Sequence, residues 1–186
     1  MTKGHLDVWS TYMSVVDVAS VDAFVAAVAD MVSGEGLLAG CLYEERGPGF
    51  LCNAGWGDGQ YPLNATFSGD RVTMFEVDFS LEEDRSEVDR WVLGGVVELP
   101  SGVALVGDPS HLSEFVPDLG GSRAVDACDL WAVMVCPGPG VLRMHVLKQA
   151  GVLDGRNLAL QAEWADVPPV GPFVSTSGES SPTSTF

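Results

Sequence analysis

The apolar and polar residues of the N-terminal region follow first a strand pattern and then a helix pattern. In residues 6–18 apolar side chains are interleaved with polar ones, which predicts an opening strand. In residues 21–32 the apolar positions form a stripe at helical spacing, between Ser20, a favourable N-cap, and Gly34. Asp22 also favours a helix N-terminus. We therefore expect a helix over residues 21–32 that covers one face of a sheet.

Beyond this helix the pattern changes to an alternation with a period of two. Alternating runs flank short turns, which predicts four successive hairpins. The turns comprise residues 46–49 (RGPG), 68–70 (SGD), 101–102 (SG) and 137–140 (PGPG). A last strand, residues 157–165, presents apolar side chains on one face and polar ones on the other. The pattern predicts a mainly β (α+β) fold, an antiparallel sandwich or bent sheet with one N-terminal helix packed on it.

The connecting segments and the C-terminal end are less regular. Residues 81–91 (LEEDRSEVDRW) predict a short acidic helix, and residues 112–116 predict a helical turn that ends before Pro117. The Pro, Ser and Thr content of the last residues cannot build a core. We expect a single β-rich domain over residues 1–166 and a tail over residues 167–186.

The composition is that of a chain that folds around its own core. The 186 residues fit one domain, 46% of them are hydrophobic, and the mean hydropathy is +0.20. No apolar run approaches the roughly 20 residues that a membrane helix requires. The N-terminus also lacks the apolar region of a secretory signal. These features predict a cytoplasmic protein with no membrane partner.

The four cysteines are expected to be reduced. A hairpin turn at residues 46–49 would place Cys41 opposite Cys52, whereas Cys128 and Cys136 lie far away in sequence. A cross-strand disulfide is geometrically possible there, but cytosolic thiols stay reduced and commonly pack as small hydrophobic groups. No CxxC or Cys/His spacing indicates a zinc site.

The formal net charge is −17, from 26 acidic and 9 basic residues. This charge argues against direct nucleic acid binding, because phosphate backbones require clustered Lys and Arg. An acidic field instead favours a basic protein partner, whose association it accelerates. High acidity also maintains solubility without any partner, and β edges that pair with copies of the chain would give a homo-oligomer.

The most unusual stretch, GWGDGQYP, is rich in glycine. Gly57 and Gly59 flank Asp58 and allow positive φ and a close backbone approach. Such a loop suits a ligand, a cation or a protein partner, but it also suits an ordinary tight turn. Trp56 lies among the glycines and is expected to be partly exposed. Together with Tyr61 it is our preferred contact patch.

A second candidate is the sequence GDPSH, which contains Asp108, Ser110 and His111. A Ser, His and Asp cluster is compatible with a hydrolase, but such residues within one turn rarely have triad geometry. The alternative is an Asp-Pro turn that caps a short helix. A carboxylate site for Ca²⁺ or Mg²⁺ is a further alternative, although no EF-hand spacing supports it. Its members would be Asp58, Asp70, Asp78 and Asp108. We predict no cofactor.

The GDG loop and the hairpin after it form a motif, GDG-x-YP followed by DF. The motif comprises Gly57, Asp58, Gly59, Tyr61, Pro62, Gly69, Asp78 and Phe79. It resembles the C-terminal signature of a bacterial family known as domain of unknown function 4241. Residues 98–109 (ELPSGVALVGDP) resemble that family's SG hairpin, and residues 136–146 are similar to its proline and glycine turn. Here the SG hairpin follows the GDG loop, whereas in the family it precedes it. The resemblance implies a β-rich domain and supplies no catalytic residues.

Taken together, the sequence predicts a non-catalytic acidic interaction protein of the immunity or inhibitor type, encoded by bacteria or phage. It would bind a basic protein, and its candidate binding residues are Trp56, Gly57, Asp58, Gly59, Tyr61, Asp108 and His111. The alternative is a metal- or nucleotide-dependent enzyme, or a small-ligand-binding protein, that uses the GDG and GDP loops. In that case Asp58, Asp108 and His111 would converge on one site.

Overall fold

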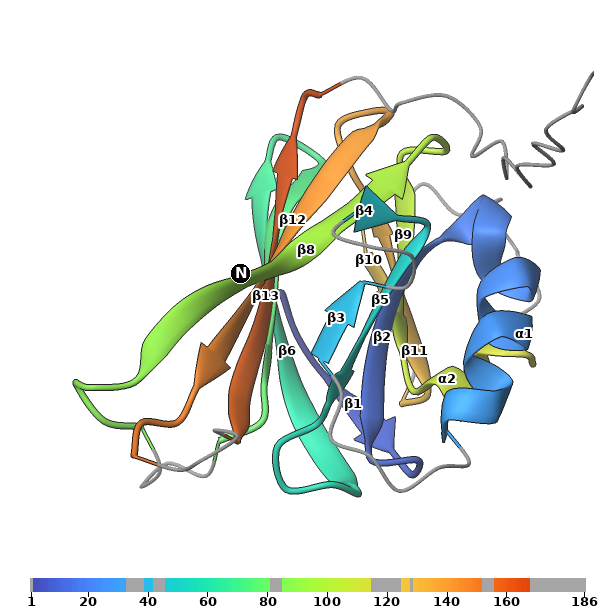
Figure 1. Ribbon diagram of the computed structural model, residues 1–186. Helices are drawn as coiled ribbons and strands as arrows, with labels where there is room; N and C mark the ends of the chain where they lie inside the picture. The colour runs from blue at the N-terminus through green and yellow to red at the C-terminus, as the bar shows by residue number, and fades with distance from the viewer. Residues whose placement is uncertain are drawn as a thin grey trace, which may run out of the picture.

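The computed structural model describes residues 2–32, 39–41, 46–80, 85–114, 125–127, 129–151 and 156–167. Within them the chain forms two packed β-sheets with a helical layer on one side (Figure 1). The prediction of a mainly β, α+β sandwich is therefore confirmed. Residues 168–186, nearly the whole predicted tail, lie outside the described residues.

In the described residues the larger sheet has seven strands and the smaller has six. In spatial order, the larger sheet consists of β1 (Thr2–Val8), β6 (Gly59–Ser68), β7 (Arg71–Asp78), β13 (Asn157–Ala165), β12 (Gly140–Lys148), β8 (Arg90–Leu99) and β4 (Arg46–Gly47). The smaller sheet consists of β10 (Val125–Ala127), β11 (Trp131–Val135), β9 (Val103–Gly107), β2 (Tyr12–Asp17), β5 (Gly49–Asn53) and β3 (Ala39–Cys41). Neighbouring strands are antiparallel, except that β4 runs parallel to β8.

Helix α1 (Val21–Val32) has the predicted bounds and covers the outer face of the smaller sheet (Figure 1). Phe24 and Val28 of α1 pack in one cluster with Leu105 of that sheet. Gly49 gives Phe24 the room it needs, because a Cβ atom at Gly49 would lie 2.2 Å from the ring. The other helices in the part of the chain that the structure describes are η1 (Val18–Ser20), which precedes α1, and α2 (Pro109–Leu112). No helix in the described residues is long and apolar enough to cross a membrane.

Strand β2 is buried on both faces because it lies in the middle of three layers. Met13 and Val15 pack into the core between the two sheets, whereas Val16 packs under α1. Ser14 is also fully buried, and its hydroxyl donates to the carbonyl of Gly107 (2.6 Å). A buried hydroxyl with such a partner avoids most of the cost of leaving water.

The opening segment forms two strands in different sheets, so the prediction of one strand over residues 6–18 was wrong. A turn at residues 9–11 separates β1 from β2, and in it Thr11 has a φ of +64°. Neither glycine nor proline marks this turn. In the sequence pattern, Ser10 and Thr11 therefore cannot be distinguished from polar residues on the solvent-facing side of a continuous strand.

Two of the four predicted hairpin turns carry the chain from one sheet to the other. The turn at residues 68–70 joins the paired strands β6 and β7, as predicted. The turn at residues 101–102 instead leads from β8 in the larger sheet to β9 in the smaller. The turn at residues 137–140 leads back from β11 to β12. Alternation and turn chemistry do not reveal whether consecutive strands pair side by side or pack face to face.

The turn predicted at residues 46–49 is not the tip of a hairpin. Its first two residues form β4 beside β8, and β5 begins at its last residue. Strand β5 pairs with β3 in a register that places Cys52 opposite Ala39. The prediction that a hairpin turn would place Cys52 opposite Cys41 was therefore wrong. Cys52 and Cys136 are buried thiols, and burial raises the pKa of each to about 12. Cys128 and the side chain of Cys41 lie outside the described part of the structure.

The predicted acidic helix over residues 81–91 is absent from its described part, residues 85–91. Two hydrogen bonds close a local turn there: Ser86 N donates to Asp89 Oδ2 (2.6 Å), and Asp89 N donates to the carbonyl of Ser86 (3.1 Å). Such side-chain bonds compete with helix formation. A helical turn was predicted at residues 112–116, but the observed helix α2 begins earlier and ends at Leu112. Residues 115–124 lie outside the described residues. Strand β10 was not predicted.

Candidate functional site at the loop end of the sandwich

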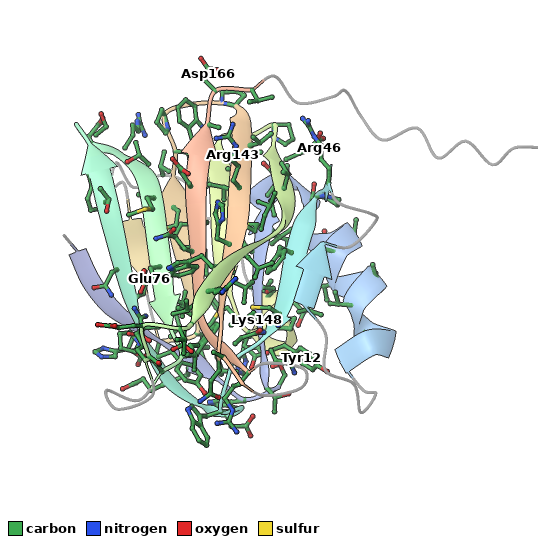
Figure 2. All side chains as sticks on the ribbon, turned by 60° about the vertical axis from the view of Figure 1, so that its left-hand side comes forward. Tyr12, Arg46, Glu76, Arg143, Lys148 and Asp166 are labelled. Atoms are coloured by element: carbon green, nitrogen blue, oxygen red, sulfur yellow. The ribbon has the colours of Figure 1, made fainter. Side chains whose placement is uncertain are left out.

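Three loops meet at one end of the sandwich, and we call them the loop cluster. They are the turn at residues 9–11, the GDG loop at residues 54–58, and residues 108–111 at the start of α2. The turn joins the other two, because Asp58 Oδ1 accepts from Thr11 N (3.2 Å) and Asp108 Oδ2 accepts from Trp9 N (2.5 Å). In Figure 2, Tyr12, which directly follows the turn, lies at the opposite end of the molecule from Asp166. The sequence predicted the two outer loops but missed the turn between them.

Asp108 is fully buried and fixes the turn to α2. Its oxygens accept five hydrogen bonds, from Trp9 N (2.5 Å), Ser10 N (2.7 Å), Ser10 Oγ (2.6 Å), Ser110 N (2.8 Å) and Ser110 Oγ (2.7 Å). Burial alone would raise the pKa of Asp108, but the bonds from Ser10, Ser110 and Trp9 outweigh it, so this pKa lies below its ordinary value. Asp108 is the N-cap of α2, as the helix-cap alternative predicts.

The GDPSH residues do not have the geometry of a catalytic triad. The Ser110 hydroxyl donates to Asp108 itself, so the imidazole does not lie between nucleophile and acid as a triad requires. His111 instead packs edge-on against Trp9, with the ring centroids 4.9 Å apart and the planes at 82°. His111 Nε2 is buried and has no hydrogen-bond partner among the described residues. His111 thus supports the indole of Trp9.

The GDG loop owes its shape to two of its glycines. Gly57 has a φ of +89°, as the sequence predicted for a residue beside Asp58. Gly55 has a φ of +36°, and a Cβ atom there would lie 2.4 Å from the carbonyl oxygen of Asn157. Gly59 has a different role, because it begins β6 opposite Val8 of β1. The loop is therefore an ordered turn seated against β13.

Tyr61 is buried, with 7% of its surface exposed, and holds the GDG loop from inside. Its hydroxyl lies 2.8 Å from the carbonyl of Gly57 and 3.1 Å from that of Ala54, and its ring packs edge-on against Phe79. Burial and, to a lesser extent, the negative charge of Asp58 raise the pKa of Tyr61. The expectation that Tyr61 forms an exposed patch with Trp56 was therefore wrong, since Tyr61 shapes the loop and does not reach the surface.

Two tryptophans of the loop cluster are exposed. Trp56 is 47% exposed, which confirms the expectation from its glycine-rich surroundings, and Trp9 is 65% exposed. The guanidinium of Arg156 lies 3.6 Å from the centre of the Trp56 ring, a cation–π contact. No local signal in the sequence reveals this contact, because the two residues belong to distant segments. Trp9 could have been noticed as an aromatic residue next to the polar pair Ser10 and Thr11.

The carboxylates proposed as a metal site are dispersed. Asp58 and Asp108 lie on either side of the turn at residues 9–11, whereas Asp70 belongs to the turn between β6 and β7. Asp78 accepts from the Ser80 hydroxyl (2.5 Å) and pairs with Arg85 (3.1 Å). In the described part of the chain no three His, Cys, Asp or Glu side chains are grouped so as to hold a metal ion.

Comparisons with known proteins found no matching family model, no matching curated protein and no matching solved structure. The resemblance to the domain of unknown function 4241 family stays a prediction. The function of the loop cluster is accordingly inferred from its own geometry.

Proposed function

We propose that this protein is a non-catalytic acidic binding protein, of the immunity or inhibitor type, that binds a basic protein through the loop cluster. The observation that carries the proposal is the exposure of Trp9 and Trp56 on adjoining loops of a chain with a net charge of −17. Tryptophan is, with tyrosine and arginine, enriched among the residues that dominate the binding energy at protein interfaces.

Both tryptophans are presented by loops that are already ordered. The backbone of Trp9 is fixed by Asp108 and its ring by His111. The GDG loop that carries Trp56 is joined to the neighbouring turn, since Ala54 N donates to the carbonyl of Thr11 (2.9 Å). A surface that is ordered before binding loses little conformational entropy when a partner docks. The loop cluster therefore has the rigidity expected of a binding surface.

Charge supports a basic partner for the same surface. Asp58 is exposed, and its carboxylate is bonded to the turn that carries Trp9. The acidic residues of the whole chain outnumber the basic ones by 26 to 9, so a cationic protein is attracted from a distance and steered on approach. In the loop cluster the exposed carboxylate of Asp58 is accompanied by the guanidinium of Arg156 over Trp56, so it is the net charge of the whole chain that favours a basic protein over an acidic one.

The alternative, an enzyme or ligand-binding protein that uses Asp58, Asp108 and His111, has less support. Both oxygens of Asp108 already accept hydrogen bonds from the protein, and a ligand or metal ion would have to displace several of these donors. His111 is packed against Trp9, and its Nε2 is buried. For these reasons we retain the binding function.

The test begins with capture of partners from a lysate of the host at low and high salt, followed by titration of the purified partner. We expect a basic protein that is recovered mainly at low salt, because screening weakens an electrostatic interface. Trp56→Ala should weaken its binding by about tenfold or more. Asp58→Asn keeps the acceptor for Thr11 N but removes the charge, so it should lower the association rate.

Val88→Ala is the control, because Val88 is an apolar residue with 63% of its surface exposed that precedes β8 and lies outside the loop cluster. It should leave partner binding unchanged. Binding that persists in high salt and in both Trp56→Ala and Asp58→Asn would refute the proposal, as would equal losses for Val88→Ala and Trp56→Ala.

A further inference from the structure

The first part of β8 carries exposed apolar side chains on both of its faces. Trp91, Val92 and Leu93 are 42%, 48% and 60% exposed. In the pairing with β12, Trp91 lies opposite Leu147 and Val92 opposite Val146. Successive residues of a strand face opposite sides of the sheet, so Trp91 and Leu93 share one face and Val92 lies on the other. Figure 1 shows this part of β8 extending away from the body of the sandwich.

The same residues also form an edge of the larger sheet. β12 occupies one side of β8, and β4 occupies the other side only beside Val96 and Val97. Within the described ranges, no strand pairs with the outer side of residues 90–93. Backbone N–H and C=O groups of alternate residues point to that side, and such an edge is a template for a further strand.

A β-bulge directs this edge outward. Gly95 pairs with Met144 and Leu93 pairs with His145, so Gly94 is an extra residue in β8. Gly95 has a φ of +151°, and a Cβ atom at Gly94 would lie 2.8 Å from the ring of the fully buried Phe50. Both positions therefore favour glycine, and the bulge that they form separates residues 90–93 from the core.

The charges beside this edge indicate what can pair with it. Arg90 and Lys148 are register partners at its start, and the exposed Glu87 and the carboxylate of Asp89 directly precede the strand, so the described charges beside this edge balance. The nearby carboxylate of Asp89 accepts from Ser86 N (2.6 Å) and Ala150 N (2.8 Å). A basic partner would therefore gain little attraction at this edge. For a second copy of this acidic chain, in contrast, it is a place where two molecules can approach without placing acidic groups face to face.

We propose that the β8 edges of two copies of this chain pair antiparallel about a two-fold axis at Val92, which joins the larger sheets of the two molecules. In this register Trp91 lies opposite Leu93 of the partner subunit, and Arg90 lies opposite Gly94 of the partner subunit. Apolar side chains then meet on both faces, and no like charges face each other across the pair. This interface is separate from the loop cluster and does not depend on the proposed function.

Sedimentation velocity over a concentration series, at low and high salt, tests the proposal. We expect a monomer–dimer equilibrium that high salt strengthens, because salt screens the repulsion between two chains of net charge −17. Val92→Lys places two like charges opposite each other at the axis and should raise the dimer dissociation constant by about tenfold or more. Val88→Lys introduces the same charge at a residue that is 63% exposed but precedes the strand, and it should leave the equilibrium unchanged.

Circular dichroism and a thermal melt of each variant show whether it is folded, and both positions are exposed enough to accept lysine. A monomer under all conditions would overturn the proposal. So would a dimer that high salt weakens, or equal effects of Val92→Lys and Val88→Lys. None of these results bears on the partner titration, which reports on Trp56 and Asp58.

Discussion

Two buried aspartates hold the loops at opposite ends of one strand pair. Asp108 follows β9, and Asp17 ends β2, its antiparallel neighbour. The carboxylate of Asp17 accepts from Ala19 N (2.8 Å), from Ser101 N (3.0 Å) and from the Ser101 hydroxyl (2.6 Å). It thereby joins η1 to the turn that leads into β9, just as Asp108 joins α2 to the turn after β1. Each end of the sandwich is thus fixed by one buried carboxylate that accepts from two segments distant in sequence.

Asp108→Asn should destabilise the fold by about 2–3 kcal/mol at neutral pH. The change removes charge-assisted hydrogen bonds, and it places the NH2 group of asparagine, itself a donor, against hydrogen-bond donors of the protein. The pKa of Asp108 in the folded state lies below that in the unfolded state, which is about 3.9. Its contribution to stability is therefore complete above that value and is lost as the pH falls through the folded-state pKa. The free energy of unfolding of the wild type and of Asp108→Asn can be measured with urea between about pH 2 and pH 7. The difference between the two free energies should become smaller as the pH falls.

Asp70→Asn is the control for this measurement, because Asp70 is 82% exposed and pairs only loosely with Arg71 (3.6 Å). It should change the unfolding free energy by less than about 0.5 kcal/mol at any pH. If the difference in unfolding free energy between wild type and Asp108→Asn stays constant down to the lowest pH, the role assigned to the Asp108 charge is contradicted.

Among the strands, β8 combines two environments within one element. Its second half carries Val97 and Leu99 into the core, whereas its first half is exposed on both faces. The change occurs at Gly94 and Gly95, where the register with β12 shifts. The bulge thus lets one continuous strand contribute both to the interior of the sandwich and to its outermost edge.

Gly94→Ala should destabilise the protein by about 1–3 kcal/mol, because the new methyl group would lie 2.8 Å from the ring of the fully buried Phe50. Gly138→Ala is the matched control, since no atom of the described residues lies within 4 Å of the position that a Cβ atom would occupy there. That variant should be neutral or stabilised by up to about 1 kcal/mol through a less flexible unfolded chain. Chemical denaturation of both variants gives the comparison. A neutral Gly94→Ala would mean that Phe50 can move aside.

The elements that the sequence predicts well are those with a long, uninterrupted period. Helix α1 was predicted with its observed bounds because its apolar stripe is regular, and β13 was predicted for the same reason. Residues 101–102 and 137–140 were misjudged because a glycine-containing turn serves equally well in a hairpin and in a crossover between sheets.

Prediction of the candidate site was limited by contacts between distant segments. The exposure of Trp56 follows from its glycine neighbours, and the capping role of Asp108 follows from the Asp-Pro turn. The burial of Tyr61 does not follow in the same way, because a tyrosine suits both a core and a surface. The contact of Arg156 with Trp56 and that of Asp108 with Trp9 join segments whose proximity only the fold determines.

For the molecule as a whole, the excess of negative charge opposes compaction. A chain of net charge −17 repels itself more strongly when folded than when expanded. We therefore expect the midpoint of urea unfolding of the monomer to rise as sodium chloride is added. The rise should be steepest at low ionic strength, because the Debye length, over which the charges repel each other, decreases fastest there. Potassium chloride should act equally, because screening depends on ionic strength. A midpoint that falls with salt, or that responds to one cation alone, would contradict this explanation.

The position of β13 has a consequence for the order in which the protein can assemble during synthesis. β13 is the last described strand in the chain, yet it lies inside the larger sheet, between β7 and β12. A ribosome-bound chain that lacks β13 therefore exposes the inner edges of both neighbouring strands, and the sheet can close only after residue 165 has emerged. The pairing of β13 with β7 joins segments that are distant in the sequence, and such pairings are slow to form, on the order of milliseconds to seconds. Protection of the nascent chain by a chaperone during this interval would favour correct closure over aggregation.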